Sequence, residues 1–140
     1  VVVAAGNDGH DACVSTPGFI ESAVVIGATE KDDVVAQYSN WGKCVDLFAP
    51  GTALPGYDNH GNELLLSGTS QSCPLAAGAL ALEMAPDGHT SSMSVSRGDA
   101  LATLISQATD LGTQDRPVKL LQVHEKNTHT ASVKSLGFFR

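Results

Sequence analysis

Three short, almost uninterrupted runs of apolar residues most strongly limit how this chain can fold. They occupy residues 1–5 (VVVAA), 23–28 (AVVIGA) and 45–49 (VDLFA). Apolar runs this short, each closed by a turn signal, are typical of buried strands. Strands that are apolar on both faces belong to parallel sheets covered on both sides. We therefore predict an α/β fold, part of a parallel β-sheet flanked by helices.

Two segments are predicted to be helices. Residues 70 to about 85 are apolar nearly all round, which is typical of a buried helix, and Pro74 falls in its first turns, where a missing N–H costs least. The second helix runs from about Arg97 to Ala108, and Ser96 with Asp99 resembles a capping box at its start. We expect further strands at residues 64–66 and 118–123, the latter an edge strand or extended segment. Residues 1–123 then form the folded domain and residues 124–140 a loosely ordered tail.

Charge and hydropathy exclude several classes of protein. The chain has 15 acidic and 8 basic residues and a formal net charge of −7. A broad surface for nucleic acid or anionic membrane is therefore not expected. No apolar stretch reaches the length of about 18 residues that a membrane-spanning helix needs. The chain opens with Val1 inside an apolar run, with no signal-peptide pattern before it, so we expect a processed product or fragment.

The segment SGTSQSCP, residues 67–74, carries the chemistry. It places Ser70 where a short strand passes into the first predicted helix. The backbone N–H groups of a first helical turn point toward the same space as such a hydroxyl and can bind an anion. This placement suits acyl transfer, in which negative charge develops on a carbonyl oxygen. The alternative for Ser70 is an ordinary helix cap.

Four motifs in order make the pattern specific. They are AAGNDG at residues 4–9, YSNWG at 38–42, DLFAPG at 46–51 and GTS at 68–70. Together they resemble the C-terminal half of the subtilisin-like serine proteases, nearest the proteinase K branch, from residue 1 to about 123. The resemblance implies the corresponding portion of a subtilisin-like three-layer fold.

The resemblance assigns roles to individual residues. It implies that Ser70 is the nucleophile, that Asn7 donates a hydrogen bond to the oxyanion, and that Ala4, Ala5 and Gly6 wall the substrate pocket. Asn7 follows the first predicted strand at its carboxyl end, where open α/β sheets bind ligands. The alternative for Asn7 is a turn residue that tolerates a left-handed conformation. The sequence departs from the family pattern after Ser70, because the polar pair at residues 71–72 stands where an apolar pair normally packs.

A serine nucleophile needs a general base and a carboxylate that orients it. In the family both come from segments upstream of the strand that Val1 opens, so the partners expected are the missing N-terminal half of the domain and a peptide or protein substrate. The chain has five histidines, at positions 10, 60, 89, 124 and 129. His60, beside a glycine, is a formal candidate for the base, but a solvated loop histidine is the alternative.

These observations favour a serine endopeptidase. They also predict that the isolated 140 residues do not hydrolyse peptides. The second hypothesis is a non-catalytic pseudoprotease that binds a protein partner through the same groove. A third is an unstable fragment of either parent.

The resemblance also concerns the three cysteines. It implies a disulfide between Cys13 and Cys44, and hence an oxidising compartment and a secreted protein. Cys73 is left over. We interpret Cys73 as a small buried hydrophobe, because no activating partner for a thiol nucleophile is evident.

A calcium site is the one cofactor that the resemblance implies. Its ligands would be the carboxylate of Asp46 and the backbone carbonyls of Glu21 and Ala23, hard oxygen ligands of the kind that Ca²⁺ takes. The alternative is that Asp46 only accepts local backbone hydrogen bonds.

Overall fold

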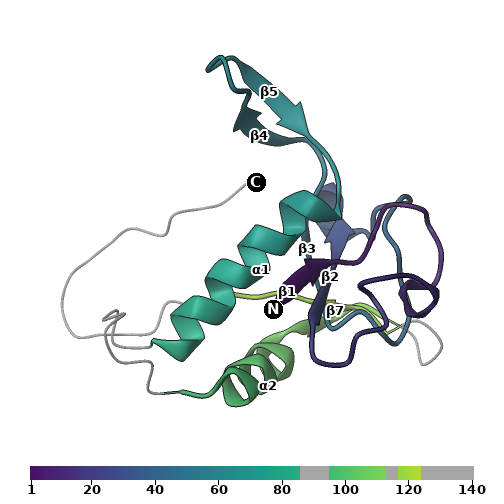
Figure 1. The fold of residues 1–140 in the computed structure, drawn as a ribbon, viewed down its shortest axis with the longest axis vertical. Coiled ribbons are helices and arrows are strands. Elements are labelled where there is room, and N and C mark those ends of the chain that lie inside the picture. The colour runs from purple at the N-terminus through teal and green to yellow at the C-terminus, as the bar shows by residue number, and fades with distance from the viewer. Residues whose placement is uncertain (86–94, 113–116, 124–140) are drawn as a thin grey trace.

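A computed structural model of the 140-residue chain describes residues 1–85, 95–112 and 117–123. The predicted tail at 124–140 lies outside these residues. The described part forms an α/β fold with one main sheet, two α-helices and a projecting hairpin (Figure 1).

The main sheet contains five strands in the order β1-β2-β3-β7-β6. Its strands are β1 (Val2–Ala4), β2 (Val24–Thr29), β3 (Leu47–Pro50), β7 (Lys119–Leu120) and β6 (Thr109–Asp110). The first four are parallel, and β6 pairs antiparallel with β7. The three apolar runs thus became β1, β2 and β3, as predicted. The segment expected at an edge, β7, instead has a partner on each side.

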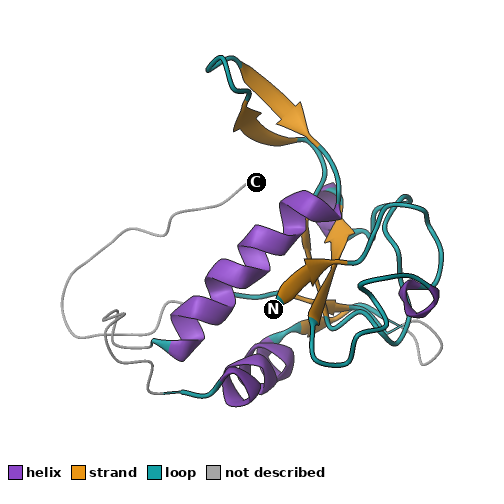
Figure 2. Ribbon diagram, viewed as in Figure 1, coloured by secondary structure: helices purple, strands orange, loops and turns teal. Residues whose placement is uncertain are grey.

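Alternation of side chains along the strands builds a core on each face of the sheet. Val24, Ile26 and Leu47 pack with α1 (Thr69–Met84) and α2 (Arg97–Gln107). Val25 and Phe48 point to the other face, which loops and the short 3-10 helix η1 (Ala12–Val14) cover. All six residues of β2 are buried, which agrees with a strand covered on both sides. Both α-helices therefore lie on one face (Figure 2).

Helix α1 follows the predicted span but is not buried all round. Ala76, Ala79 and Leu80 are buried, whereas Leu75 is 45% exposed and Leu82 is 60% exposed. The prediction of a completely buried helix was wrong for this structure, because the described residues cover α1 only on the side of the sheet and α2.

Helix α2 begins as its capping signal predicts. The Ser96 hydroxyl accepts a hydrogen bond from the Asp99 N–H at 3.2 Å and donates one to the Asp99 carboxylate at 2.7 Å. Ala100 and Leu104 are buried against the core, and Leu101 and Ile105 pack at its edge. The helix is therefore anchored by one apolar stripe, as its periodicity indicates.

No strand is predicted between the runs at residues 45–49 and 64–66, but part of that segment forms one. β4 (Leu54–Tyr57) pairs antiparallel with β5 (Glu63–Leu66), and this hairpin projects away from the body of the molecule (Figure 1). A second 3-10 helix, η2 (Lys31–Asp33), follows β2. Within the described ranges, no helix is long and apolar enough to cross a membrane.

Candidate active site

The start of α1 is fastened to the carboxyl ends of β2 and β3. The Gly68 N–H donates to the Gly51 carbonyl at 2.7 Å, and the Gly51 N–H donates to the Thr29 carbonyl at 2.9 Å. A side chain at Gly51 has no room, because a Cβ there would lie 2.3 Å from the Ser72 hydroxyl oxygen. Ser70, in the first turn of α1, therefore lies at the sheet edge where parallel α/β sheets bind ligands.

Asn7 meets this helix start from the loop that follows β1. Its side-chain Oδ1 accepts hydrogen bonds from the Thr69 N–H and the Thr69 hydroxyl, each at 2.9 Å. The Thr69 hydroxyl oxygen in turn accepts a bond from the Gly6 N–H at 3.2 Å. Gly68, at the N-cap, has no side chain, so Asn7 caps the helix from 62 residues away. The acceptor end of the Asn7 amide is thereby occupied.

Two hydrogen-bond donors remain available at the start of α1, where Ser70 lies. The Asn7 Nδ2 makes no hydrogen bond within the described residues, and neither does the exposed Ser70 hydroxyl. The Ser70 N–H belongs to the first turn of α1, where backbone N–H groups have no partner inside the helix. An amide N–H₂ and a helix N-terminal N–H can together stabilise a negatively charged oxygen.

The polar pair after Ser70 is accommodated by the fold. Ser72 is completely buried, and its hydroxyl donates to the Ala49 carbonyl at 2.9 Å, which joins α1 to β3. Gln71 is half-buried, and its Oε1 lies 3.0 Å from where a Cβ on Gly68 would be. The departure from the family pattern therefore introduces no unpaired hydroxyl in the core at Ser72.

The three residues expected to wall a substrate pocket form the approach to Asn7. Ala4 ends β1, Ala5 is buried, and Gly6 has φ +103°, a conformation that favours glycine. Their role in substrate binding stays a prediction.

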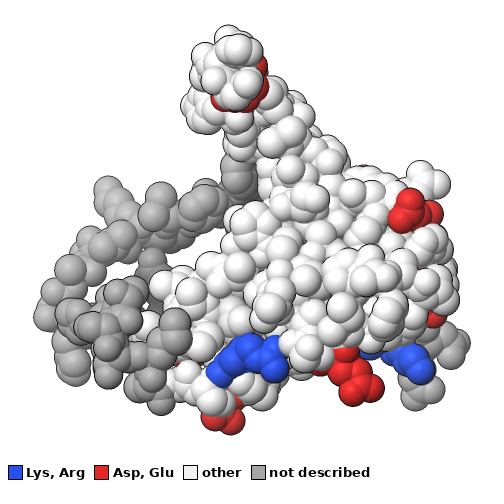
Figure 3. Space-filling model, viewed as in Figure 1, with Lys and Arg blue, Asp and Glu red and all other residues white. Residues whose placement is uncertain are grey.

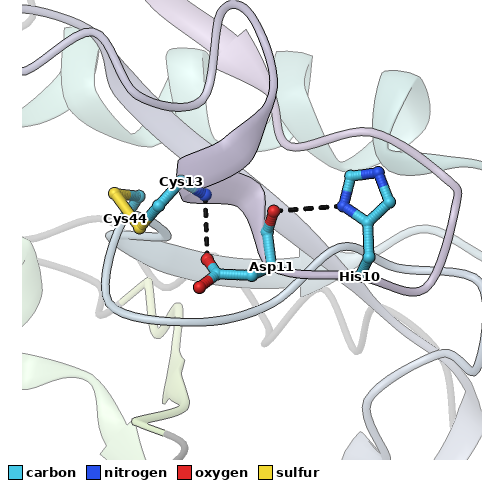
Figure 4. Close-up of a disulfide and its surroundings, with 4 residues drawn as sticks. All are labelled: His10, Asp11, Cys13 and Cys44. Carbon is cyan, nitrogen blue, oxygen red and sulfur yellow. Dashed lines mark hydrogen bonds between the residues drawn. A yellow bond between two sulfur atoms is a disulfide. The ribbon is translucent and has the colours of Figure 1, made fainter.

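Neither described histidine is paired with Ser70. His10 Nδ1 donates to the neighbouring Asp11 carbonyl at 3.0 Å (Figure 4), and its Nε2 lies 3.7 Å from the Asp8 carboxylate. His60 lies in the turn of the β4–β5 hairpin, where its backbone N–H donates a hydrogen bond to the Asp58 carboxylate. The other three histidines lie outside the described residues.

The predicted disulfide is present. Cys13 and Cys44 are bonded, with Cα atoms 5.3 Å apart and a sequence separation of 31 (Figure 4). The Asp11 carboxylate accepts a hydrogen bond from the Cys13 N–H at 2.9 Å. The disulfide therefore ties the loop after Asn7 to the loop before β3.

Cys73 is free and half-buried. Burial raises the pKa of its thiol, so less thiolate forms at neutral pH. The raised pKa is unfavourable for a thiol nucleophile, but the prediction of a buried Cys73 holds only in part, because the side chain is half-buried.

Asp46 accepts a backbone hydrogen bond, as expected from the alternative to a calcium site. Its carboxylate accepts a hydrogen bond from the Val25 N–H at 2.8 Å. Burial raises the pKa of Asp46, while that hydrogen bond and the Arg97 charge act in the opposite direction. Arg97 itself donates to the Ser22 carbonyl at 2.9 Å. Among the described residues, no group of three or more His, Cys, Asp or Glu side chains is placed to hold a metal ion.

Comparison with known proteins identifies the family. The family model described as "Subtilase family" matches residues 1–124. The chain belongs to the subtilase family. As a subtilase it is similar to Proteinase T of Parengyodontium album, at 49% identity over 78 residues, covering 56% of this chain and 27% of that protein. It is also 38% identical to alkaline serine exoprotease A of Vibrio alginolyticus, covering 77% of this chain and 19% of the relative.

A solved structure supports the same fold. The crystal structure of a cold adapted subtilisin-like serine proteinase aligns with a TM-score of 0.72 and 30% identity, covering 86% of this chain and 44% of the other. This subtilase chain therefore has the subtilisin-like α/β fold and spans less than half the length of that structure. It spans about a fifth to a quarter of its curated relatives.

The sequence reasoning missed the role of Thr69. This residue touches both Gly6 and Asn7 and so joins the two distant parts of the site. Its position next to Ser70 in the GTS motif was the available signal, but the bonds depend on how β1 and α1 pack together.

Proposed function

We propose that this chain carries the nucleophile and the oxyanion-binding groups of a serine endopeptidase. The observation that carries the proposal is the Asn7–Thr69 contact. It holds the Asn7 Oδ1 at the start of the helix and leaves Nδ2 without a hydrogen bond among the described residues, while Ser70 is exposed in the first turn of the same helix. Ser70 would be the nucleophile, with Asn7 Nδ2 and the Ser70 N–H as donors to the oxyanion.

The proposed reaction proceeds through an acyl-enzyme. The Ser70 Oγ attacks the carbonyl carbon of a peptide bond while a general base takes its proton, and the carbonyl oxygen becomes an oxyanion. Asn7 and the Ser70 N–H stabilise that charge. The tetrahedral intermediate expels the amine, which takes the proton, and water then releases the acid. Ala4, Ala5 and Gly6 would line the pocket for the substrate side chain.

The general base and its carboxylate are proposed to come from another part of the subtilase domain. Neither His10 nor His60 bonds to Ser70. The exposed side of α1, with Leu75 and Leu82, and the edge of β1 that pairs with no described strand form a surface on which such a part could dock. Figure 3 shows this face almost free of charged side chains, which favours an apolar contact. Residues 1–123 would then be the C-terminal part of the peptidase domain.

A fluorophosphonate probe tests the proposal, because it labels a serine only when that serine is activated. We expect labelling of Ser70 in the chain extended through the coding sequence upstream of Val1. In the 140-residue chain we expect Ser70 to be labelled only at a small residual rate. Ser70→Ala should abolish labelling, while Ser67→Ala, in the same segment, should preserve it.

If the extended protein folds but stays unlabelled, Ser70 is not an activated nucleophile. That result would replace the endopeptidase with the pseudoprotease that binds a protein partner. Strong labelling of the 140-residue chain would contradict the proposed origin of the base, and His60→Ala would then be the first variant to examine.

Secretion is part of the same proposal. The disulfide between Cys13 and Cys44 supports an oxidising compartment. A relative 45% identical over 84 residues is named extracellular serine proteinase, from a Thermus strain. No nucleic-acid or membrane partner is proposed.

Calcium at Asp46 also remains a proposal, and the donor atoms fit it. The carbonyl oxygens of Glu21 and Ala23 accept no hydrogen bond from the described residues, and Asp46 adds a half-buried carboxylate. These are hard oxygen ligands. Bound calcium would supply charge neutralisation and would tie the turn before β2 to the start of β3.

Thermal unfolding with and without calcium tests this site. Calcium at about 100 times its Kd should stabilise the wild-type chain by about 2.7 kcal/mol, and Asp46→Asn should remove that gain. Asp32→Asn is a matched control, because Asp32 is exposed with φ 65°, where asparagine is tolerated, and it should keep the whole gain. If Asp46→Asn lowered stability equally with and without calcium, that result would contradict a calcium site at Asp46.

A further inference from the structure

Asn40 is a completely buried polar residue that the proposed chemistry leaves unused. It lies in the loop before β3 with an exposed fraction of 0%. A buried amide is expected to satisfy both its donor and its acceptor. The hydrogen bonds of its side chain and of its backbone N–H all lead to one place, the segment that carries Asn7.

Asn40 holds that segment on both sides of Asn7. Before Asn7, the Asn40 Nδ2 donates to the Ala5 carbonyl at 2.9 Å, and the Asn40 N–H donates to the Gly6 carbonyl at 2.9 Å. After Asn7, the Asn40 Oδ1 accepts the Asp8 N–H at 3.0 Å and the His10 N–H at 3.2 Å. Asn7 is itself exposed, so these backbone anchors determine where it can lie.

The amide chemistry of Asn40 is what this position requires. The nitrogen end must donate a hydrogen bond to a carbonyl, and the oxygen end must accept hydrogen bonds from two N–H groups. An ionised aspartate has no donor, and a serine hydroxyl has only one oxygen to serve both purposes. Gly6 packs directly on this amide, because a Cβ at Gly6 would lie 2.4 Å from the Asn40 Nδ2.

We propose that Asn40 is a positioning residue for the oxyanion-binding group: it fixes the backbone around Asn7, while Thr69 fixes the Asn7 side chain. The effect on catalysis rests on the proposed endopeptidase function. A misplacement of about 1 Å in a catalytic group can lower a rate by about a hundredfold. Asn40 thus acts on the reaction through Asn7 without touching the substrate.

The first test needs no activity and uses the 140-residue chain. Amide hydrogen exchange followed by NMR should show Asp8 and His10 exchanging about tenfold faster in Asn40→Ala, because each loses its acceptor. The side-chain amide signal of Asn7 should move toward its position in an unfolded peptide. The amides of β2 should remain protected. Unchanged exchange at Asp8 and His10 would overturn the proposal.

Ser39→Ala is a matched control in the neighbouring residue. Ser39 is 1% exposed, and its hydroxyl also makes two hydrogen bonds, with the Ala28 N–H and the Asn40 carbonyl. Neither bond reaches the Asn7 segment. If Ser39→Ala raised the exchange rates of the Asp8 and His10 amides as much as Asn40→Ala does, the effect would be general destabilisation and the proposal would fail.

Gly6→Ala keeps the test decisive if Asn40→Ala does not fold. The added methyl group would push on the same amide from the loop side, at a half-buried position. We expect faster exchange at Asp8 and His10 there too. Protection equal to wild type at both amides would overturn the proposal.

The second test measures peptide hydrolysis by the upstream-extended protein. Asn40→Ala should lower kcat by about tenfold to a hundredfold with little change in KM, whereas Ser39→Ala should stay close to wild type. A loss that appears only in KM would contradict a role at the oxyanion. If wild-type protein has no activity, the proposed function fails, and the exchange experiment still decides whether Asn40 holds the Asn7 segment.

Discussion

Replacing Phe48 with alanine should lower the free energy of unfolding of this chain by about 3–5 kcal/mol. Phe48 lies in β3 and is 1% exposed. Its ring covers Gly27 of the neighbouring strand, because a Cβ at Gly27 would lie 2.4 Å from the Phe48 Cε1. The ring also packs with Val25 and Val118 in the core of the face that carries no α-helix.

The effect is large because no neighbouring side chain is placed to fill the space that the Phe48 ring leaves. Gly27 has no side chain that could move into the cavity, and loops with the short 3-10 helix η1, rather than α-helices, cover this face. The deleted ring therefore costs both its transfer free energy and an unfilled cavity. Urea unfolding followed by circular dichroism would measure the difference. Leu65→Ala is the control, since Leu65 is exposed in β5, and it should change stability by no more than about 0.5 kcal/mol. A loss below about 1 kcal/mol for Phe48→Ala would show that the loops refill the space.

Removing the disulfide should cost about 3.7 kcal/mol in the chain-entropy description of a loop of this length. The 31-residue separation between Cys13 and Cys44 sets the loop that the bond closes in the unfolded chain. In the folded chain the bond joins η1 to the segment before β3. The double substitution Cys13→Ser with Cys44→Ser should therefore unfold at a lower urea concentration than the oxidised wild type.

Reduction of the wild-type chain provides the matching experiment. Dithiothreitol should destabilise the wild type by about the same amount as the double substitution, and it should leave the double variant unchanged, because Cys73 is already free. If dithiothreitol also changed the double variant, its effect would not arise from this bond. Equal stability of oxidised wild type and double variant would contradict the prediction.

Local pattern was sufficient to predict most of the regular elements. The runs at residues 1–5, 23–28 and 45–49 became β1, β2 and β3, and Ser96 with Asp99 marked the start of α2. Apolar continuity and capping chemistry act within a few residues, so they can be read from a short window. The hairpin strand β4 was missed because Pro55 and Gly56 are typical of a turn, yet pairing with β5 made that segment a strand. The two-residue strand β6 carries no signal of its own.

The candidate site was predicted only in part. The ordered motifs indicated Ser70 and Asn7 through their resemblance to the family. Nothing in those motifs predicted that Thr69 would bind the Asn7 Oδ1, or that Asn40 would hold the backbone on both sides of Asn7. Those partners lie 62 and about 30 residues away along the chain, so only the packing of β1 against α1 and the following loops brings them together.

The sequence by itself therefore indicated most of the strand and helix segments, the parallel sheet and, through the family resemblance, the candidate reactive groups. Each of these depends on side-chain chemistry within a short stretch of chain. The tertiary structure decided which end of the Asn7 amide is occupied, which side of α1 is covered, and where β7 lies in the sheet. Hydrogen-bond partners and burial depend on segments that are distant in sequence. Such contacts exist only after the chain has folded.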